Sequence, residues 1–290
     1  MIPITGATLV AGVVGRPVRH SMSPILHNAW LAAAGLDGVY VALSPTLEGF
    51  PALIEGLRGG ALRGLNVTLP FKEAALAAAD QASERARRAG AANVLVFDAD
   101  GTIRADNTDG LGLIGAIAAQ APACVIASAP AVVLGAGGAG RGAAAALLDA
   151  GASEVRIVNR TLAKALDIQA ALGPAVRVFG WDELAQANAD AGLLVNATSL
   201  GLDGREPPLA ALEHLPPGAV VMDMVYKPLR TALLIQAAAA GHPVVDGLEM
   251  LIRQAVPAFE AFFGRPPPGD VDVRALALAA LGQAKQGEQP

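Results

Sequence analysis

Cysteine is nearly absent from this chain, whose 290 residues contain only one, Cys124. A single cysteine excludes an internal disulfide and a paired-cysteine metal site, and it is typical of proteins of the reducing cytoplasm. We expect Cys124 itself to be a small core residue. The four histidines stand at positions 20, 27, 214 and 242, without a carboxylate or thiol at metal-ligand spacing. This spacing disfavours a metal site.

Charge is scarce as well. Charged residues make up 16% of the chain and the net charge is −5, so the basic surface that a nucleic acid requires is missing and nucleic acid is not an expected partner. The first residues, "MIPITGATLVAGVVG", lack the basic segment of a secretory signal, and no clean apolar run of about 20 residues follows. We therefore expect a soluble cytoplasmic protein that does not enter a membrane.

Apolar residues are abundant, at 53% of the chain, and together with 33 glycines they predict large, closely packed cores. A length of 290 residues favours two domains. In the first third, apolar extended runs alternate with helical stretches, a pattern typical of an α/β layer with largely parallel strands. Within "NVLVFDADGTIRADN", two extended runs flank Asp-Ala-Asp-Gly, which predicts a β-hairpin, and "TDGLGLIGAIAAQ" then predicts a helix. The first domain should end near residue 111.

Residues 112–247 contain a second series of short apolar strands separated by helical segments, from "AVVLGAGGAGRG" to "HPVVDG". Such a series is typical of a doubly wound parallel sheet, so we predict a Rossmann-type domain. The segments beyond it, "LEMLIRQAVPAFEAFFG" and "DVRALALAALGQA", read as helices, and Pro257 is expected to bend or divide the first of them.

A glycine-rich turn opens the second domain. "VVLGAGGAG" places Gly135, Gly137 and Gly138 between an apolar strand and an Ala-rich helix. Glycines let backbone N–H groups approach a pyrophosphate, whose charge the helix N-terminus favours. The next strand ends in "VNRT", where the ribose of a dinucleotide would lie. Arg160 and Lys164 stand where an NAD site carries an acidic residue, which favours NADP; the alternative is that both are solvated surface cations.

Two serines mark the first domain. "GRPVRHSMSPILHN" is expected to hold Ser21 and Ser23 on one side of an extended segment, with both hydroxyls facing the same way. Ser23 also precedes a proline that suits a helix start, so it could merely cap that helix. Other polar residues stand at expected strand ends, where open α/β sheets bind ligands. They are Asn66, Thr68, Lys72, Asn93 and Asp109. For Asp109 the alternative is a helix N-cap.

Lys72 occupies an unfavourable place. "GLNVTLPFKEAALAAAD" predicts a buried strand over 64–69, Pro70 at the first position of a helix, and Lys72 in its first turn. A cation is disfavoured there by roughly 0.3 to 1 kcal/mol. A solvated surface lysine is one explanation, and a proton-transferring group in a site is the other.

Nine sequence blocks together resemble those of the shikimate dehydrogenases, in order and from about Val13 to Ala255. The blocks are "VVGRPVRHSMSPILHN", "GLNVTLPFKE", "GAANVL", "DNTDG", "LGAGGAGRG", "VNRT", "NATSLG", "DMVYKP" and "GLEMLIRQA". The resemblance implies NADP-dependent interconversion of 3-dehydroshikimate and shikimate, in the chorismate pathway to the aromatic amino acids. It also implies that the N-terminal domain, 1–111, binds the substrate and that helices at about 248–290 return to complete it.

Carried over by position, the resemblance assigns a role to each matching residue. The catalytic pair would be Lys72 and Asp109. Ser21 and Ser23, helped by Tyr226, would bind the substrate carboxylate, and Thr68, Asn93 and Gln254 its ring hydroxyls. The cofactor residues would be Gly135, Ala136, Gly137, Gly138 and Ala139 at the pyrophosphate, Asn159, Arg160, Thr161 and Lys164 at the 2′-phosphate, and Met222, Gly247 and Met250 at the nicotinamide.

Three positions depart from the family pattern. Val94 stands where a hydroxyl residue commonly follows the asparagine, Glu249 where a small residue is usual, and Lys164 where arginine is frequent. These departures bear on fine specificity and cofactor affinity. Two alternatives stay open: a paralogue that acts on quinate or an aminoshikimate, and a catalytically silent protein that senses such a metabolite. The sequence does not decide the oligomeric state, so a homodimer also stays open.

Overall fold

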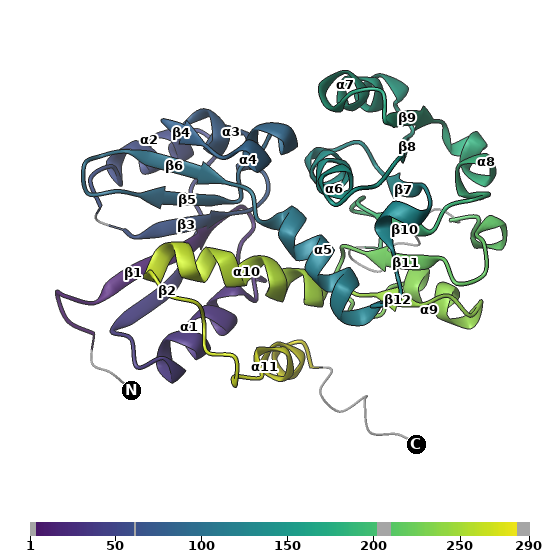
Figure 1. Cartoon of the computed structure of the whole chain (residues 1–290). Helices are drawn as coiled ribbons and strands as arrows, with labels where there is room; N and C mark the ends of the chain where they lie inside the picture. Colours follow the sequence, from purple (N-terminus) through teal and green to yellow (C-terminus); the bar gives the residue numbers. More distant parts are fainter. Residues whose placement is uncertain (1–3, 61, 202–209, 283–290) are drawn as a thin grey trace. The chain divides into compact units, whose positions relative to one another are not determined.

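The computed structural model describes residues 4–60, 62–201 and 210–282. These residues form two compact units (Figure 1). The first comprises the described residues of 1–108 and 254–290, and the second those of 109–253. Each unit contains one six-stranded sheet.

The sheet of the first unit has the strand order β2-β1-β3-β5-β6-β4. Its strands are β1 (Leu9–Val14), β2 (Gly38–Leu43), β3 (Gly64–Val67), β4 (Gln81–Ala82), β5 (Val94–Phe97) and β6 (Ile103–Asp106). The strands β2, β1 and β3 are parallel, whereas β5 and β6 form the expected antiparallel hairpin. Tight-turn chemistry at Asp98 to Gly101 therefore predicted this hairpin correctly.

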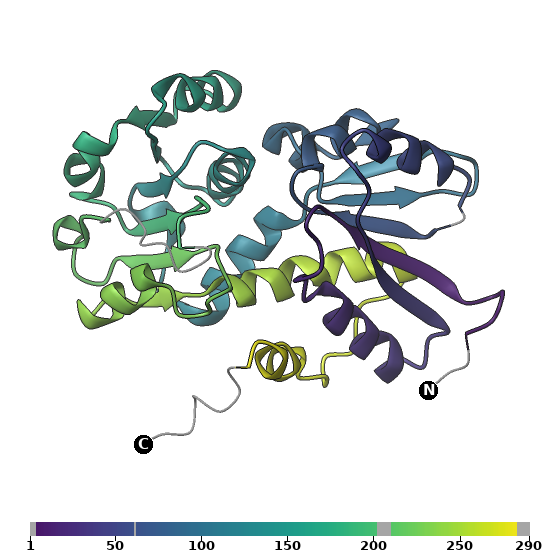
Figure 2. The same ribbon diagram turned by 180° about the vertical axis from the view of Figure 1, so that it is seen from behind.

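Helices cover both faces of this sheet (Figures 1 and 2). They are α1 (Ser23–Ala33), α2 (Gly49–Gly56), α3 (Lys72–Ala77), α4 (Glu84–Ala89) and the C-terminal part of α10 (Gly247–Phe263). A further helix, α11 (Val273–Ala280), packs against α1. α10 can approach β3 closely because Gly64 has no side chain: a Cβ there would lie 2.3 Å from the Phe262 ring. Pro257 does not divide α10, which runs unbroken to Phe263.

The second unit contains a wholly parallel sheet of order β12-β11-β10-β7-β8-β9. Its strands are β7 (Ala131–Leu134), β8 (Val155–Val158), β9 (Val176–Phe179), β10 (Leu193–Asn196), β11 (Val220–Asp223) and β12 (Val244–Val245). Its helices are α5 (Asp109–Gln120), α6 (Gly138–Asp149), α7 (Leu162–Leu172), α8 (Leu184–Asn188) and α9 (Ala232–Ala239). This order is that of the Rossmann fold, in which successive strands are added outwards on one side of β7 and then, from β10 onwards, on the other side. The predicted fold class is confirmed.

Burial explains why these strands are largely apolar, apart from Arg156 in β8 and the polar last residues of β10 and β11. Every residue of β7, β8, β10 and β11 is buried. Parallel sheets with helices on both faces require apolar residues on both sides of each strand. Polar side chains are therefore found mainly at the ends of these strands.

Candidate active site

The glycine turn after β7 has the geometry of a phosphate-binding loop. Gly135 adopts a φ of +103°, and a Cβ there would also lie 2.9 Å from Thr198 Cγ2. A Cβ on Gly140 would lie 2.1 Å from the Gly135 carbonyl oxygen, so this glycine permits the close approach of α6 to the turn. Open space surrounds the positions that a Cβ would take at Gly137 and Gly138. The loop thus leaves room for a pyrophosphate at the start of a 12-residue helix.

Asn159 connects this loop to the segment after β8. Its Oδ1 accepts a hydrogen bond from the Ala136 N–H at 3.2 Å, and its Nδ2 donates to the Thr161 carbonyl at 2.8 Å. Arg160, Thr161 and Lys164 are exposed at the start of α7. The residues present therefore fit a dinucleotide whose pyrophosphate lies on the loop and whose ribose phosphate meets exposed cations.

The nicotinamide residues need one correction. Met222 has no exposed surface and packs in the core, because it lies within β11 where both faces are covered. Met224, beyond the end of the strand, instead lines a small cleft together with Met250. The other residues of that cleft are Asp109, Gly110, Leu113, Gly138, Ala139, Gly142 and Ala143. Gly247 lies close by in the chain fold, since a Cβ there would lie 2.5 Å from the Met224 carbonyl oxygen.

A buried carboxylate that we did not predict fixes the loops after β10 and β11. Asp223 Oδ1 accepts hydrogen bonds from Asn196 Nδ2 and the Val225 N–H, both at 3.0 Å, and its Oδ2 accepts from the Thr231 hydroxyl at 2.6 Å. Burial raises the pKa of Asp223, while these three donors oppose the shift. The loop that it anchors carries Met224 and the half-buried Tyr226, whose pKa burial also raises.

In the first unit, the two serines are arranged differently from the expectation. Met22 adopts a helical conformation, so Ser21 and Ser23 do not lie on an extended segment. Instead, Ser21 Oγ accepts a hydrogen bond from the Ser23 N–H at 3.3 Å. Ser23 does not cap α1 either: the N-cap is Met22, and Ser23 is the first residue of the helix. The capping explanation for Ser23 is therefore wrong.

A chain of buried polar groups leads away from Ser23. The Ser23 hydroxyl is hydrogen-bonded to the Tyr40 phenol, whose pKa is raised by burial in spite of this bond. Tyr40 Oη donates to Asn66 Oδ1 at 2.7 Å, and Asn66 Nδ2 donates to the Asn93 carbonyl at 3.2 Å. Asn28 holds the Tyr40 backbone from both sides, with one bond to its carbonyl and one from its N–H, each 2.9 Å long. Neither Tyr40 nor Asn28 was singled out from the sequence.

The chain continues into a group of buried amides. Asn93 is 3% exposed and Gln254 is 7% exposed, and Asn93 Nδ2 donates to Gln254 Oε1 at 3.1 Å. Thr108 contacts both residues through its N–H and its hydroxyl. Two residues assigned to the ring hydroxyls are thus direct neighbours, although they are 161 positions apart.

Thr68, Lys72 and Asp109 also lie near strand ends. Thr68 follows β3 and packs against Gly15, where a Cβ would lie 2.3 Å from Thr68 Cγ2. Lys72 is the half-buried first residue of α3, and its carbonyl accepts from the Ala92 N–H at 2.9 Å. The helix begins two residues after Pro70 and ends at Ala77, so it is shorter than expected. Asp109 is the first residue of α5 and not its N-cap.

Two of the departures from the family pattern have a structural explanation. Glu249, 8% exposed, forms an ion pair with Arg253 one helical turn later, at 2.8 Å. Val94, 1% exposed, packs inside the sheet of the first unit. Both side chains are therefore accommodated within their own units.

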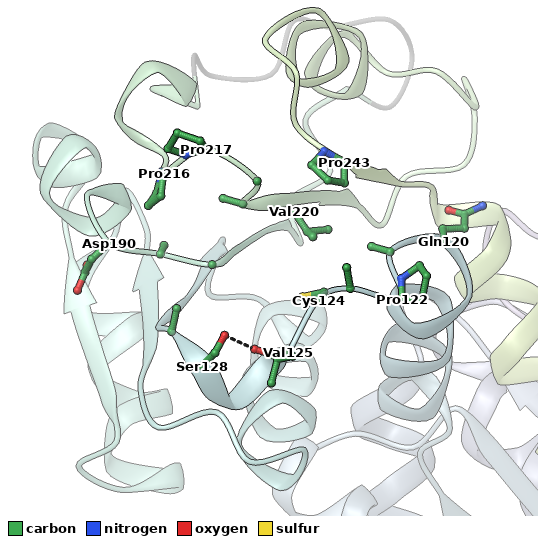
Figure 3. Close-up of a pocket in the computed structure, with 17 residues that line it drawn as sticks. Gln120, Pro122, Cys124, Val125, Ser128, Asp190, Pro216, Pro217, Val220 and Pro243 are labelled. Carbon is green, nitrogen blue, oxygen red and sulfur yellow. Dashed lines mark hydrogen bonds between the residues drawn. The ribbon is translucent and has the colours of Figure 1, made fainter.

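A pocket of about 420 Å³ opens on the opposite edge of the second sheet, at the starts of β7, β10 and β11 (Figure 3). Its wall is rich in proline and includes Cys124, which is half-buried and packs against the core of this unit. Burial raises the pKa of this thiol. Because open parallel sheets bind ligands at the carboxyl ends of their strands, this pocket is not the candidate site.

Within the part of the chain that the structure describes, no group of three or more His, Cys, Asp or Glu side chains could hold a metal ion. No described helix is long and apolar enough to span a membrane.

Comparisons with known proteins match these units in order. Residues 13–95 match the family model of the shikimate dehydrogenase substrate-binding domain, 117–201 that of shikimate / quinate 5-dehydrogenase, and 247–276 that of the shikimate 5'-dehydrogenase C-terminal domain. A shikimate dehydrogenase (NADP(+)) of Caulobacter vibrioides is 59% identical over 280 residues, which are 97% of this chain and 98% of the relative.

Solved structures agree with these matches. Shikimate 5-dehydrogenase from Thermus thermophilus, in complex with NADP(H) and shikimate, is 39% identical with a TM-score of 0.83, over 96% of this chain and 100% of that one. Quinate dehydrogenase from Corynebacterium glutamicum, in complex with NAD, is 29% identical with a TM-score of 0.84, over 95% of this chain and 99% of that one. On sequence and structure together, the chain belongs to the shikimate dehydrogenase family.

Proposed function

We propose that this protein catalyses the reversible, NADP-dependent reduction of 3-dehydroshikimate to shikimate, in the chorismate pathway of aromatic amino acid biosynthesis. The observation that carries the proposal is the near-complete match to a solved relative in complex with NADP(H) and shikimate. The glycine loop, the exposed Arg160 and the buried amides of the first unit supply the matching chemistry. The proposed compartment is the cytoplasm, where a single cysteine stays reduced.

The cofactor would be held by residues of the second unit. Gly135 to Ala139 would bind its pyrophosphate, and Asn159, Arg160, Thr161 and Lys164 its 2′-phosphate. Met250, Gly247 and, on the geometry of the cleft, Met224 in place of Met222 would contact the nicotinamide. When bound, the cofactor supplies or accepts the hydride.

The substrate would be recognised chiefly by the first unit. Ser21 and Ser23, together with Tyr226, would donate hydrogen bonds to its carboxylate, and Thr68, Asn93 and Gln254 would bind its ring hydroxyls. Donors to a charged carboxylate contribute more than donors to neutral groups, so the serines should supply the larger part of the binding energy.

Lys72 and Asp109 would handle the proton. Oxidation of a secondary alcohol to a ketone releases the hydroxyl proton as the hydride leaves, and the reverse reaction returns it. We assign this proton to Lys72, as base in oxidation and as acid in reduction, with Asp109 orienting the amine. This role explains why a lysine stands at the first residue of α3, where the helix start favours an acidic side chain.

The test is a steady-state comparison of shikimate and quinate, each with NADP and with NAD. We expect the highest kcat/KM for shikimate with NADP, because Arg160 and Lys164 replace the acidic residue of an NAD site. A preference for quinate with NAD, as in the Corynebacterium relative's name and bound cofactor, would instead support the paralogue. Binding of shikimate without turnover with either cofactor would support the silent sensor.

A further inference from the structure

Thr108 ends the first unit and contacts both of the buried amides. Its side chain is 1% exposed, and its backbone N–H donates to Asn93 Oδ1 at 2.7 Å. A backbone N–H can only donate, so the amide of Asn93 must turn its oxygen towards Thr108. The nitrogen of that amide is then its remaining polar atom, and it can only donate.

The orientation of the Asn93 amide determines that of the Gln254 amide. Asn93 Nδ2 donates to Thr108 Oγ1 at 3.0 Å and to Gln254 Oε1 at 3.1 Å. Because an amide nitrogen can only donate, Gln254 must present its oxygen to Asn93 and turn its nitrogen away. The Thr108 hydroxyl can donate its proton to Gln254 Oε1 at 3.4 Å, 146 positions away, or to Asn93 Oδ1 at 3.2 Å.

We propose that Thr108 is a positioning residue, whose N–H and hydroxyl together fix the amide orientations of Asn93 and Gln254 before the substrate arrives. The inference rests on the proposed function, in which both amides bind the ring hydroxyls. A hydroxyl group can donate or accept, whereas each end of an amide does only one of these. Fixing the two amides therefore fixes which ring hydroxyls donate and which accept, and it avoids an ordering cost on binding.

The test separates the hydroxyl from the shape of the side chain. Thr108→Val keeps the branched side chain and the backbone N–H but removes the hydroxyl, whereas Thr108→Ser keeps the hydroxyl. One neutral hydrogen bond corresponds to about a three- to tenfold change in affinity, so KM for shikimate should rise by that factor in Thr108→Val. KM for NADP and kcat should stay within about twofold of the wild type. Thr108→Ser should restore the KM for shikimate.

A matched control and a double mutant complete the design. Thr8→Val removes a hydroxyl that donates to Asp37 at 2.7 Å, in the same unit but before the start of β1, and should leave KM unchanged. In a Gln254→Ala background, adding Thr108→Val should raise KM by less than half of its effect in the wild type, because the two residues act through one contact. Urea denaturation of each variant reports the stability effect separately.

The outcomes are distinct. Wild-type protein that does not reduce NADP with shikimate would refute the proposed function, and this inference with it. Active wild type with an unchanged KM in Thr108→Val, or with equal effects of that substitution in both backgrounds, would overturn the inference alone. A fall in kcat without a rise in KM would also overturn it, because Thr108 would then act on its neighbour Asp109 and not on the amides.

Discussion

His27 should make the first unit less stable as the pH falls from neutrality. The ring has no exposed surface, stacks on Tyr40 at 4.1 Å between centroids, and meets the edge of Trp30 at 5.6 Å. Neither ring nitrogen has a hydrogen-bond partner among the described residues. Burial lowers the pKa of His27 from 6.5 to about 3. The folded state therefore keeps this histidine neutral where the unfolded chain protonates it.

The sign and size follow from proton linkage. Between about pH 3 and pH 6.5 the unfolded state binds one more proton than the folded state, so stability rises with pH across this window and is lost on acidification. One pKa unit corresponds to about 1.4 kcal/mol, so at pH 5, about 1.5 units below the unfolded pKa, the loss is about 2 kcal/mol. This figure depends little on the folded pKa, as long as that value stays well below 5.

Urea denaturation at pH 7.5 and pH 5.0 measures this difference. The chain has two tryptophans, so a Trp181→Phe background leaves Trp30, which contacts His27, as the fluorescent reporter. His27→Phe retains an aromatic ring but cannot titrate, and its pH-dependent loss should be about 2 kcal/mol smaller than that of the parent. His20→Asn, at an exposed histidine, should retain the full loss. If His27→Phe loses as much stability as the parent between the two pH values, the reasoning is refuted.

Three further predictions concern the proposed site. Lys72→Ala should lower kcat by about 10² to 10⁴ in steady-state assays of shikimate oxidation, whereas a near-normal kcat with a raised KM would make Lys72 a substrate-binding residue only. Arg160→Ala should weaken NADP by about ten- to a hundredfold and leave NAD nearly unaffected, as measured by titration of both cofactors; equal losses would contradict the phosphate assignment. Ser21→Ala and Ser23→Ala should each raise KM for shikimate by roughly tenfold or more with little change in kcat. An analogue with a hydroxymethyl group in place of the carboxylate should be a poor substrate for the wild type. It should lose little more in the Ser21→Ala, Ser23→Ala double mutant, because the contact is already absent there. If that analogue binds as well as shikimate, the carboxylate assignment is wrong.

Features encoded by short stretches were predictable from the sequence. The strand, glycine turn and helix around Gly135 are contiguous, and the φ of Gly135 and the close approach of Gly140 to the Gly135 carbonyl both arise within this one supersecondary unit. The hairpin of β5 and β6 likewise follows from four turn residues. The alternation of strands and helices was sufficient to predict the fold class, because parallel sheets need a crossover between successive strands.

Features that depend on the end of an element were less predictable. Periodicity did not show that Met22 would be helical, and so the geometry of Ser21 and Ser23 was wrong. The resemblance alone did not distinguish the two methionines around Asp223, because the end of β11 decides which one leaves the core. The contact of Asn93 with Gln254 joins residues 161 positions apart and has no local signal.

Asn66 shows that a polar residue near a strand end can support the site without binding the ligand itself. It stands near the end of β3, where ligands of open α/β sheets bind, and on that ground it was a candidate ligand residue. In the structure its Oδ1 accepts from Tyr40 and its Nδ2 donates to the Asn93 carbonyl, and the side chain is 6% exposed. A buried amide needs such partners, because an unsatisfied polar group costs about 1 to 3 kcal/mol. Asn66 therefore supports Ser23 and Asn93 through Tyr40 and the backbone. A strand-end position indicates the region of a site, whereas the donors and acceptors of each side chain decide whether it binds the substrate or holds a residue that does.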